Sequence, residues 1–347
     1  MKRVFITLLT IATLISCSKD EIVKEASKLP ISFGNVFVEN STRATDNTYG
    51  STNVLKHFNV YGTVTGNSNT VNIYNGDAVE GTIGGDWNCK KVQYWVPDCT
   101  YAFTAIANRN SGDDTNNTSN TINVNSTTGM PESITYDATS QVDLLLATAA
   151  DSTNAQGEPQ TAGENPVAFT FNHLLSKAQF TFTNNFTEDS GVVLKVTDIK
   201  ITNAHKKAVY TISPAGWGTP TESYTGTDTD FLSFGNSDQM LANGGKSTSE
   251  MVCLLIPGTY NLNIEFTINH NKGGNPSTKT INQDVTLLAG NSYNFTAELN
   301  ASNVNGVVPI TFNIITSQDG WDDDFNPSVG PVYPPESNTN NGNQANE

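Results

Sequence analysis

"VAFTFNHLLSKAQFTF", residues 167 to 182, shows the pattern that decides the fold class of this chain. Apolar and aromatic side chains alternate with polar or small ones over 167–171 and again over 178–182. A period of two residues predicts β-strands, because successive side chains of a strand point to opposite faces. Residues 174–178 lack this alternation and are the best local candidate for a short helix.

The strand pattern recurs along the chain, separated by turn-forming stretches such as Asn75-Gly76-Asp77. No long amphipathic helix is found, and the other short helical candidate covers 140–150. Many short strands between turns predict an all-β fold built of β-sandwiches. The predicted strands are 31–33, 58–61, 92–96, 101–107, 167–171, 178–182, 192–201, 208–212, 260–268, 281–287, 292–299 and 309–314.

Length and charge narrow the class of protein further. The 347 residues exceed what one hydrophobic core usually organises, so two domains are expected. The chain carries 18 basic and 34 acidic residues, a net charge of −16. Nucleic acid is therefore not an expected partner, because binding phosphates needs clustered positive charge. Only 15% of residues are charged, a composition common in extracellular β proteins.

The N-terminus has the features of an export signal. Lys2 and Arg3 precede an apolar stretch over 4–15, which is shorter than the roughly 20 residues of a membrane-spanning helix. Residues 14–17, Leu-Ile-Ser-Cys, resemble a bacterial lipobox, in which the peptide is cut before the cysteine and the new N-terminus is acylated. We therefore expect residues 1–16 to be removed and Cys17 to carry a lipid. The alternative is an ordinary signal peptide with an incidental cysteine.

Two polar segments lie outside the strand pattern. Residues 151–165 are rich in Gly, Pro, Gln and Ser, and they are predicted to form a loop near a domain boundary. Residues 326–347 carry four prolines before an Asn-rich run, which predicts disorder.

The sequence contains no motif for catalysis or for a metal. The four histidines are scattered singly and no Cys-x-x-Cys occurs, so a zinc site has no support. No Gly-x-Ser-x-Gly nucleophile elbow is present. The aspartates over 319–324 do not follow calcium-loop spacing, and we interpret them as a solvated acidic segment. We predict no enzymatic activity, no cofactor and no metal.

Cys89 and Cys99 leave two alternatives open. An exported, oxidising context favours a disulfide, and a hairpin between the two residues would bring their Cα atoms within about 7 Å. A single strand through 92–96 would instead hold them about 30 Å apart. Cys253 lies in an apolar run and is predicted to be a buried small side chain.

Trp87, Tyr94, Trp95 and Tyr101 also allow two interpretations. Aromatic rings stack on the apolar faces of sugars, so these residues could form a glycan-binding platform. The apolar neighbours of Trp95 and Tyr101 favour packing in the core. A glycan-binding outer-membrane lipoprotein is therefore the alternative function.

Several segments, taken in order, resemble the fimbrillins, the pilin-like lipoproteins of Gram-negative anaerobes, and especially their fimbrillin-like branch. The resemblance covers nearly the whole chain and implies two transthyretin-like β-sandwich domains in tandem. The expected layout is a signal peptide at 1–16, a lipidated tether at 17–29, sandwich domains at 30–165 and 166–321, and a polar tail at 322–347. The segments are the lipobox at Cys17, "SFGNVFVENSTRAT" at 32–45, "FNVYG" at 58–62, "YWVPDCTYAFTAIA" at 94–107, "DLLLAT" at 143–148, the stretch at 167–182, "LLIPGTYNL" at 254–262 and "ITFNIITSQDGW" at 310–321.

The resemblance also implies how such a protein matures. In fimbrillins an arginine-specific protease cuts in the N-terminal segment, and Arg43-Ala44 matches that position; the alternative is an ordinary solvated arginine. Cleavage would release the strand-like segment 30–38, and a neighbouring subunit would fill the groove with a strand, for which 309–315 is the best candidate. The same segment also fits a permanent last strand of the second domain.

These implications define the expected function and partners. We expect a surface-exposed fimbrial (pilus) subunit or fimbrillin-like adhesin, located in the outer membrane and at the cell surface. Its expected partners are other fimbrial subunits joined by strand addition, the outer membrane through the lipid, and a host or bacterial surface receptor. Residues 151–153, Asp-Ser-Thr, resemble the O-glycosylation pattern of exported proteins in these bacteria, so Ser152 is an expected attachment site.

Overall fold

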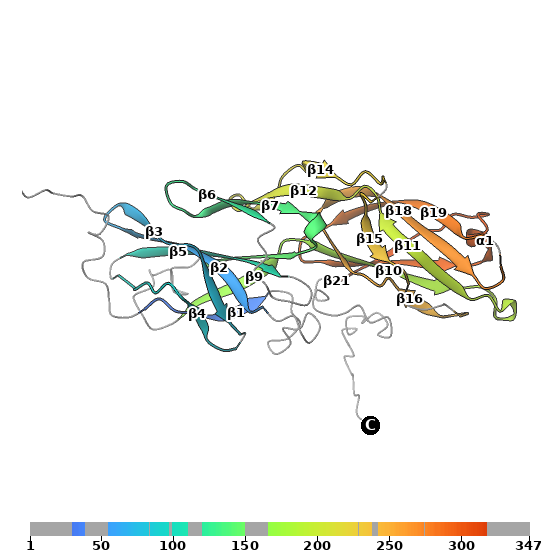
Figure 1. Cartoon of the computed structure of the whole chain (residues 1–347), viewed down its shortest axis with the longest axis horizontal. Coiled ribbons are helices and arrows are strands. Elements are labelled where there is room, and N and C mark those ends of the chain that lie inside the picture. Colours follow the sequence, from blue (N-terminus) through green and yellow to red (C-terminus); the bar gives the residue numbers. More distant parts are fainter. Residues whose placement is uncertain are drawn as a thin grey trace, which may run out of the picture.

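A computed structural model of the chain describes residues 30–38, 55–82, 84–96, 99–109, 120–149, 166–227, 229–237, 242–273 and 275–317. Figure 1 shows two bodies placed end to end along the longest axis. Nearly every described element is a strand, and the described helical elements are the turns η3 (Ala138–Ser140), η4 (Glu188–Ser190) and α1 (Ala301–Val304). The prediction of an all-β fold is confirmed.

Seven strands of the first body form a sheet that closes on itself. Closure depends on the first strand, which pairs in parallel with the last strand of this sheet and antiparallel with a short strand on its other side. Alternate side chains point inward and form one core, which includes Phe58, Phe103 and Phe171. In sheet order the strands are β1 (Phe33–Val38), β4 (Trp87–Cys89), β3 (Asn69–Gly81), β2 (His57–Gly66), β5 (Thr100–Arg109), β8 (Asp143–Ala149) and β9 (Val167–His173).

A second sheet covers part of the outside of this closed sheet, and it joins strands from both halves of the sequence. Its central pair is β7 (Pro131–Asp137) and β12 (His205–Thr211), which run antiparallel. Figure 1 shows these strands along the upper side, reaching from one body towards the other. The remaining strands of this sheet are β6 (Thr121–Val124), β13 (Gly216–Trp217) and β14 (Glu222–Ser223).

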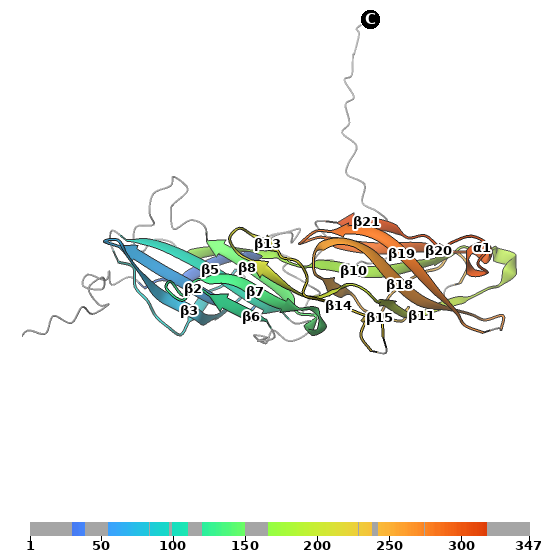
Figure 2. The same ribbon diagram turned by 90° about the horizontal axis from the view of Figure 1, so that it is seen from above.

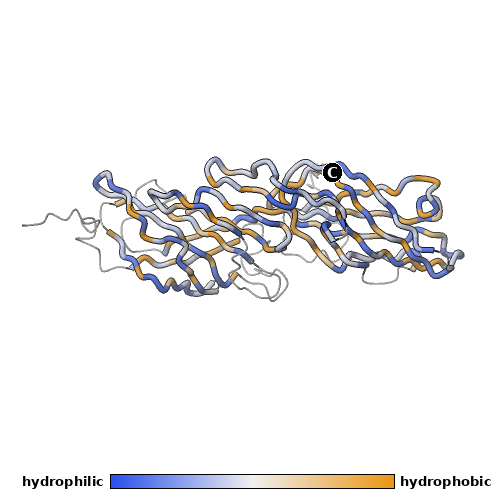
Figure 3. Tube along the Cα trace, turned by 45° about the horizontal axis from the view of Figure 1, so that its top comes forward, coloured by the Kyte–Doolittle hydropathy of each residue, from blue (hydrophilic) through white to orange (hydrophobic). Residues whose placement is uncertain are grey.

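The second body is a sandwich of two sheets with one core between them, seen from above in Figure 2. Figure 3 shows hydrophilic and hydrophobic residues alternating along its strands, as expected where one face of each strand is buried. One sheet has the order β16 (Lys246–Thr248), β10 (Ser176–Asn184), β20 (Ser292–Leu299) and β21 (Asn313–Ser317), with β17 (Cys253–Leu255) beside β10. The other has the order β15 (Leu232–Gly235), β11 (Leu194–Ile201), β18 (Gly258–His270) and β19 (Ser277–Leu287).

Both helical predictions were wrong. Residues 143–149 form β8, in which Leu145 faces the core of the closed sheet while Leu144 and Leu146 face the covering sheet. A strand that is buried on both faces is continuously apolar, so its period of two residues is hidden. Residues 174–175 form the connection between β9 and β10, and β10 already begins at Ser176.

Two local predictions in the first body also differ from the structure. Residues 92–96 are not a strand, and only Tyr94 forms an isolated bridge, to Pro30. The predicted turn at 75–77 lies inside β3, where the pairing with β2 shifts between Val60 and Tyr61. Gly76 has φ +77°, and the irregularity is a β-bulge that uses its conformational freedom.

The chain crosses from one body to the other between β9 and β10. The expected boundary at 165/166 lies before β9, but β9 belongs to the closed sheet of the first body. β12 then returns to pair with β7 of the covering sheet. The two bodies therefore share a sheet, in addition to being joined by the connection at 174–175.

The apolar layer under this shared sheet predicts a large effect of core truncation. Ile134 of β7 is fully buried in this layer. We expect Ile134→Ala to lower the free energy of unfolding by about 2–5 kcal/mol, because the cavity adds to the lost burial. Val124→Ala in β6, where the side chain is 40% exposed, is the control and should change it by less than about 0.5 kcal/mol. Urea unfolding of both variants measures the difference, and equal effects would contradict the assigned packing.

Candidate functional site

The candidate site is β1 together with the groove it fills, because β1 immediately precedes the segment that contains Arg43. Cys17, Arg43, Ala44 and Ser152 themselves lie outside the described residues, so their predicted roles stay predictions. The structure does describe 30–38, the segment that was expected to be a leader strand, and it forms β1 over Phe33–Val38.

The backbone of β1 is held between two unlike neighbours. On one side it runs parallel to β9, with Phe33 opposite Val167 and Val38 opposite Phe171. On the other side Phe33 pairs with Trp87 of β4, and the Ile31 N–H donates to the Gln93 carbonyl at 2.8 Å. β1 therefore bridges the two ends of a sheet that would otherwise be open.

The side chains of β1 belong to the core and not to a surface strand. Ile31, Phe33, Val36 and Val38 are each at most 6% exposed. The Phe33 ring lies at the centre of an aromatic cluster, with centroid distances of 6.3 Å to Phe58, 5.5 Å to Tyr74, 6.2 Å to Phe103 and 5.9 Å to Phe169. Edge-to-face and offset stacked arrangements at such distances are favourable in addition to the area they bury.

Gly34 allows β1 to approach the start of β9 closely. A Cβ atom at this position would lie 2.8 Å from Cγ of Pro166, which is closer than side-chain carbons approach one another. A larger residue would therefore push β1 away from β9. The role of Gly34 could not be predicted from the sequence, because it depends on a contact with Pro166, a residue far away in the chain.

Without β1, the first body would have an open apolar groove. β9 and the short β4 would each expose one edge, and the rings around Phe33 would lose their cover. Unpaired edges are templates for another strand, whose backbone would supply hydrogen bonds and whose alternate side chains would enter the groove. In the structure this groove is filled by β1 of the same chain.

The segment 309–315 was the expected donor strand. In the structure Ile310 and Phe312 are 4% and 7% exposed and lie in the core of the second body. Phe312 contacts Phe180 at 5.5 Å and Phe266 at 5.9 Å between ring centroids. Pairing begins only at Asn313, where β21 lies along β20. The structure therefore places this segment as the last described strand of its own sandwich.

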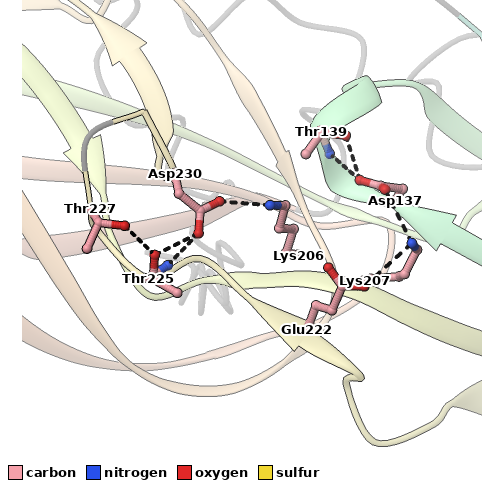
Figure 4. A network of polar contacts seen from close by, with 8 residues as sticks. All are labelled: Asp137, Thr139, Lys206, Lys207, Glu222, Thr225, Thr227 and Asp230. Atoms are coloured by element: carbon pink, nitrogen blue, oxygen red, sulfur yellow. Dashed lines mark hydrogen bonds and ion pairs between the residues drawn. The ribbon is translucent and has the colours of Figure 1, made fainter.

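A polar network holds β12 at the junction of the two bodies (Figure 4). Lys206 Nζ contacts Asp230 Oδ1 at 2.8 Å, and this bond, followed by that from Thr225, lowers the pKa of Asp230. On the neighbouring position Lys207 Nζ lies 3.7 Å from Asp137. Every charged group drawn there has a partner, so the network is suited to positioning β12 and not to catalysis.

The proposed aromatic platform does not form. Trp87, Trp95 and Tyr101 are at most 4% exposed and belong to the core of the closed sheet. Trp95 packs on Tyr101 with ring centroids 4.6 Å apart. Tyr94 is 47% exposed, so one ring of the four is available to a ligand. Core packing was the correct interpretation of Trp95 and Tyr101.

The strand register separates Cys89 from Cys99. Cys89 pairs with Val79, and Val79 pairs with Phe58 near the start of β2. Cys99 lies against Gly66 at the other end of β2. The eight steps along the strand from Phe58 to Gly66 span about 26 Å, far beyond the reach of a disulfide. Of the two alternatives left open for Cys89 and Cys99, the disulfide is therefore not formed in this fold.

Other candidate chemistry is also structural. His173 Nδ1 lies 3.0 Å from Asp143 Oδ1, and both residues are buried. Burial raises the pKa of the Cys253 thiol far above its usual value, which keeps it protonated and unreactive. In the part of the chain that the structure describes, no group of three or more His, Cys, Asp or Glu residues could hold a metal ion. Nor does any described helix have the length and apolar character to cross a membrane.

The two-body all-β arrangement has counterparts among fimbrial proteins. A fimbrial protein from Bacteroides vulgatus ATCC 8482 matches with a TM-score of 0.56 at 15% identity, covering 83% of this chain and 98% of that one. The fimbrial anchor protein Mfa2 from Porphyromonas gingivalis matches with a TM-score of 0.37 at 9% identity, covering 83% and 98%. At 15% identity the likeness to the Bacteroides vulgatus protein concerns the fold alone, and the Mfa2 match, with its lower TM-score, adds no argument about the fold. No curated protein matches the sequence.

The sequence itself identifies the family. The fimbrillin-like family model matches residues 42–315, most of the chain. The chain belongs to the fimbrillin-like family, as the sequence segments indicated.

Removing the central ring of β1 should weaken the whole first body. We expect Phe33→Ala to lower the free energy of unfolding by about 3–5 kcal/mol, because four aromatic contacts are lost together. Tyr94→Ala, in the neighbouring segment, is the control and should have an effect below about 1 kcal/mol, since its side chain is half exposed. Chemical unfolding measures both. A Phe33→Ala protein as stable as the control would show that β1 is not part of the core.

Acidification should weaken the junction through His205. This ring packs on Tyr260 at 4.3 Å, and burial lowers the pKa of His205 below its ordinary value near 6.5. The unfolded chain then takes up the proton first, so stability present above about pH 6.5 is lost as the pH falls below it. His205→Gln should show a shallower loss of unfolding free energy between about pH 7 and 5 than the wild type. The exposed His270→Gln should follow the wild type, and parallel curves for all three proteins would refute the prediction.

Proposed function

We propose that the chain is a surface-exposed fimbrial subunit or fimbrillin-like adhesin that assembles by protease-triggered strand exchange. The observation that carries this proposal is the position of β1. This strand fills the core of the first body, and it ends at Val38, five residues before Arg43. A cut after Arg43 would therefore detach from the folded body a strand that the closed sheet needs.

The arginine content limits where such a protease can cut. The full sequence has arginine at three positions, Arg3, Arg43 and Arg109. Arg3 would be lost with the signal peptide, and Arg109 is the last residue of β5, within the closed sheet. An arginine-specific protease would then have two target residues in the mature chain, and only a cut after Arg43 would release β1. Acylation of Cys17 would hold the uncut precursor in the outer membrane until this step.

A strand from a neighbouring subunit would replace β1 after cleavage. It would run parallel to β9 and place alternate apolar side chains in the positions of Phe33, Val36 and Val38. If 309–315 were this donor, it would have to leave its own sandwich, and vacating the place of Phe312 costs about 3–5 kcal/mol. Filling the groove of the next subunit must offset that cost. The register of the β1–β9 pair supports a groove that accepts a strand, and it does not bear on which strand would be the donor.

The proposal also covers the location of the protein, its partners and its glycosylation. The protein would be non-enzymatic, anchored in the outer membrane, exposed at the cell surface and joined to other fimbrial subunits. A receptor on host or bacterial cells would be its adhesive partner, and Ser152 would carry an O-glycan. A glycan-binding lipoprotein remains the alternative function, although the aromatic residues first considered for it are mostly buried.

Arginine substitution tests the proposal. Arg43→Ala should leave a folded, lipidated monomer, because the leader cannot be removed and β1 keeps the groove closed. The measurement is the ladder of detergent-resistant polymers on gels of surface protein from the native host, together with N-terminal sequencing of the monomer.

The matched control is Arg109→Lys, which keeps the charge at the end of β5. It should polymerise like the wild type, with an N-terminus at Ala44. Ladders that persist in Arg43→Ala cells, or cleavage that is lost only in Arg109→Lys, would refute strand release at Arg43.

A further inference from the structure

The outer face of the sheet that contains β10 and β20 carries a groove of about 600 Å³. Thr181 and Thr183 of β10 and Thr296 of β20 lie on its floor. These side chains point away from the core, because Phe180 and Phe182, the alternate residues of β10, pack inside the sandwich. The groove therefore lies opposite the core and far from the strand-binding site of the first body.

The floor of the groove has a hydrogen-bonding group without a partner. Thr181 is 5% exposed, and its Oγ1 atom has no hydrogen-bond partner. Gln179 and Asn294 form the neighbouring residue pair on the same face of the sheet. The Gln179 Nε2 and Asn294 Oδ1 atoms are also buried without a partner. Buried polar groups are nearly always paired, and leaving them unpaired is unfavourable. Gln179 and Asn294 do not line the groove, whereas Thr181 does, so it is the unpaired Thr181 hydroxyl that points to a ligand.

The lining is hydroxyl-rich and has no net charge. Lys246 and Glu298 are the charged residues of the lining, one of each sign. Val308 and Ile315 form an apolar part of the wall and are 45% and 40% exposed. Neutral hydroxyl and amide groups beside apolar surface match the surface of a neutral sugar, which has many hydroxyl groups and apolar C–H faces. The volume is in the range of small-ligand sites.

A peptide strand or an acidic ligand fits this groove less well. β10 pairs with β20 on one side and with β16 and β17 on the other, so the backbone groups of this strand on the floor of the groove are already used. A phosphate or sialic acid would need more positive charge than Lys246 supplies next to Glu298. We propose that this groove binds a short neutral oligosaccharide, with Thr181 Oγ1 as the hydrogen-bonding group at its floor.

Binding can be tested on the full mature chain by saturation-transfer NMR and calorimetry. The probes are maltotriose, cellotriose, mannotriose and triacetylchitotriose, with 3′-sialyllactose as the charged comparison. At least one neutral trisaccharide should bind. Thr181→Val, which keeps the shape and removes the hydroxyl, should weaken that binding at least tenfold, while its melting temperature stays equal or rises because an unpaired polar group is removed.

Two further variants complete the test. Thr280→Val, at an exposed position on β19 in the opposite sheet, is the matched control and should bind like the wild type. Thr183→Val should also weaken binding, and it serves if Thr181→Val does not fold. Lys246→Gln should have little effect on a neutral probe.

Three results would overturn the proposal. The first is that no neutral trisaccharide binds, or that binding is undiminished in Thr181→Val and Thr183→Val. The second is binding of sialyllactose alone, lost in Lys246→Gln, which would assign the groove to an acidic ligand. The third is a concentration-dependent dimer in sedimentation velocity that disappears in Thr181→Val, which would assign the groove to a second copy of the chain.

Discussion

The packing of Phe33 into a ring of aromatic side chains is the interaction on which the first body depends. Through it β1 is held against β9 and β4, and a seven-stranded sheet is closed. Because β1 comes from the beginning of the chain and β9 from its middle, closure joins segments about 130 residues apart in sequence. β1 is thus part of the core, although residues 39–56 separate it in sequence from β2.

The shared sheet makes the two bodies one structural unit. β5 and β8 are buried on both faces, by the core of the closed sheet and by the layer beneath β7 and β12. The ion pairs of Lys206 and Lys207 fix β12 on both sides at the junction (Figure 4). A flexible linker would bury no such layer.

The two sheet faces of the second body have different chemistry. The inner faces form a continuous apolar core in which Phe312 joins aromatic residues from both sheets. The outer face of β10 is almost as buried but polar, and it leaves Thr181 Oγ1 without a partner. Folding alone would favour an apolar or fully paired face there, so this departure from the rule is where a function beyond assembly is expected.

Local pattern was sufficient for the fold class, most long strands, the family and the strand at 33–38. Alternating runs such as 178–182 and 260–268 report one buried face directly, and they lie in β10 and β18. The helix expected at 140–150 was wrong because β8 is buried on both faces and shows no alternation, and the one expected at 174–178 was wrong because it covers the connection between β9 and β10 and the start of β10. Closure by β1, the return of β12 to β7, the separation of Cys89 from Cys99 and the unpaired Thr181 were decided by tertiary structure alone. Each depends on which distant strands pair and in what register, and a period of two residues does not encode that choice.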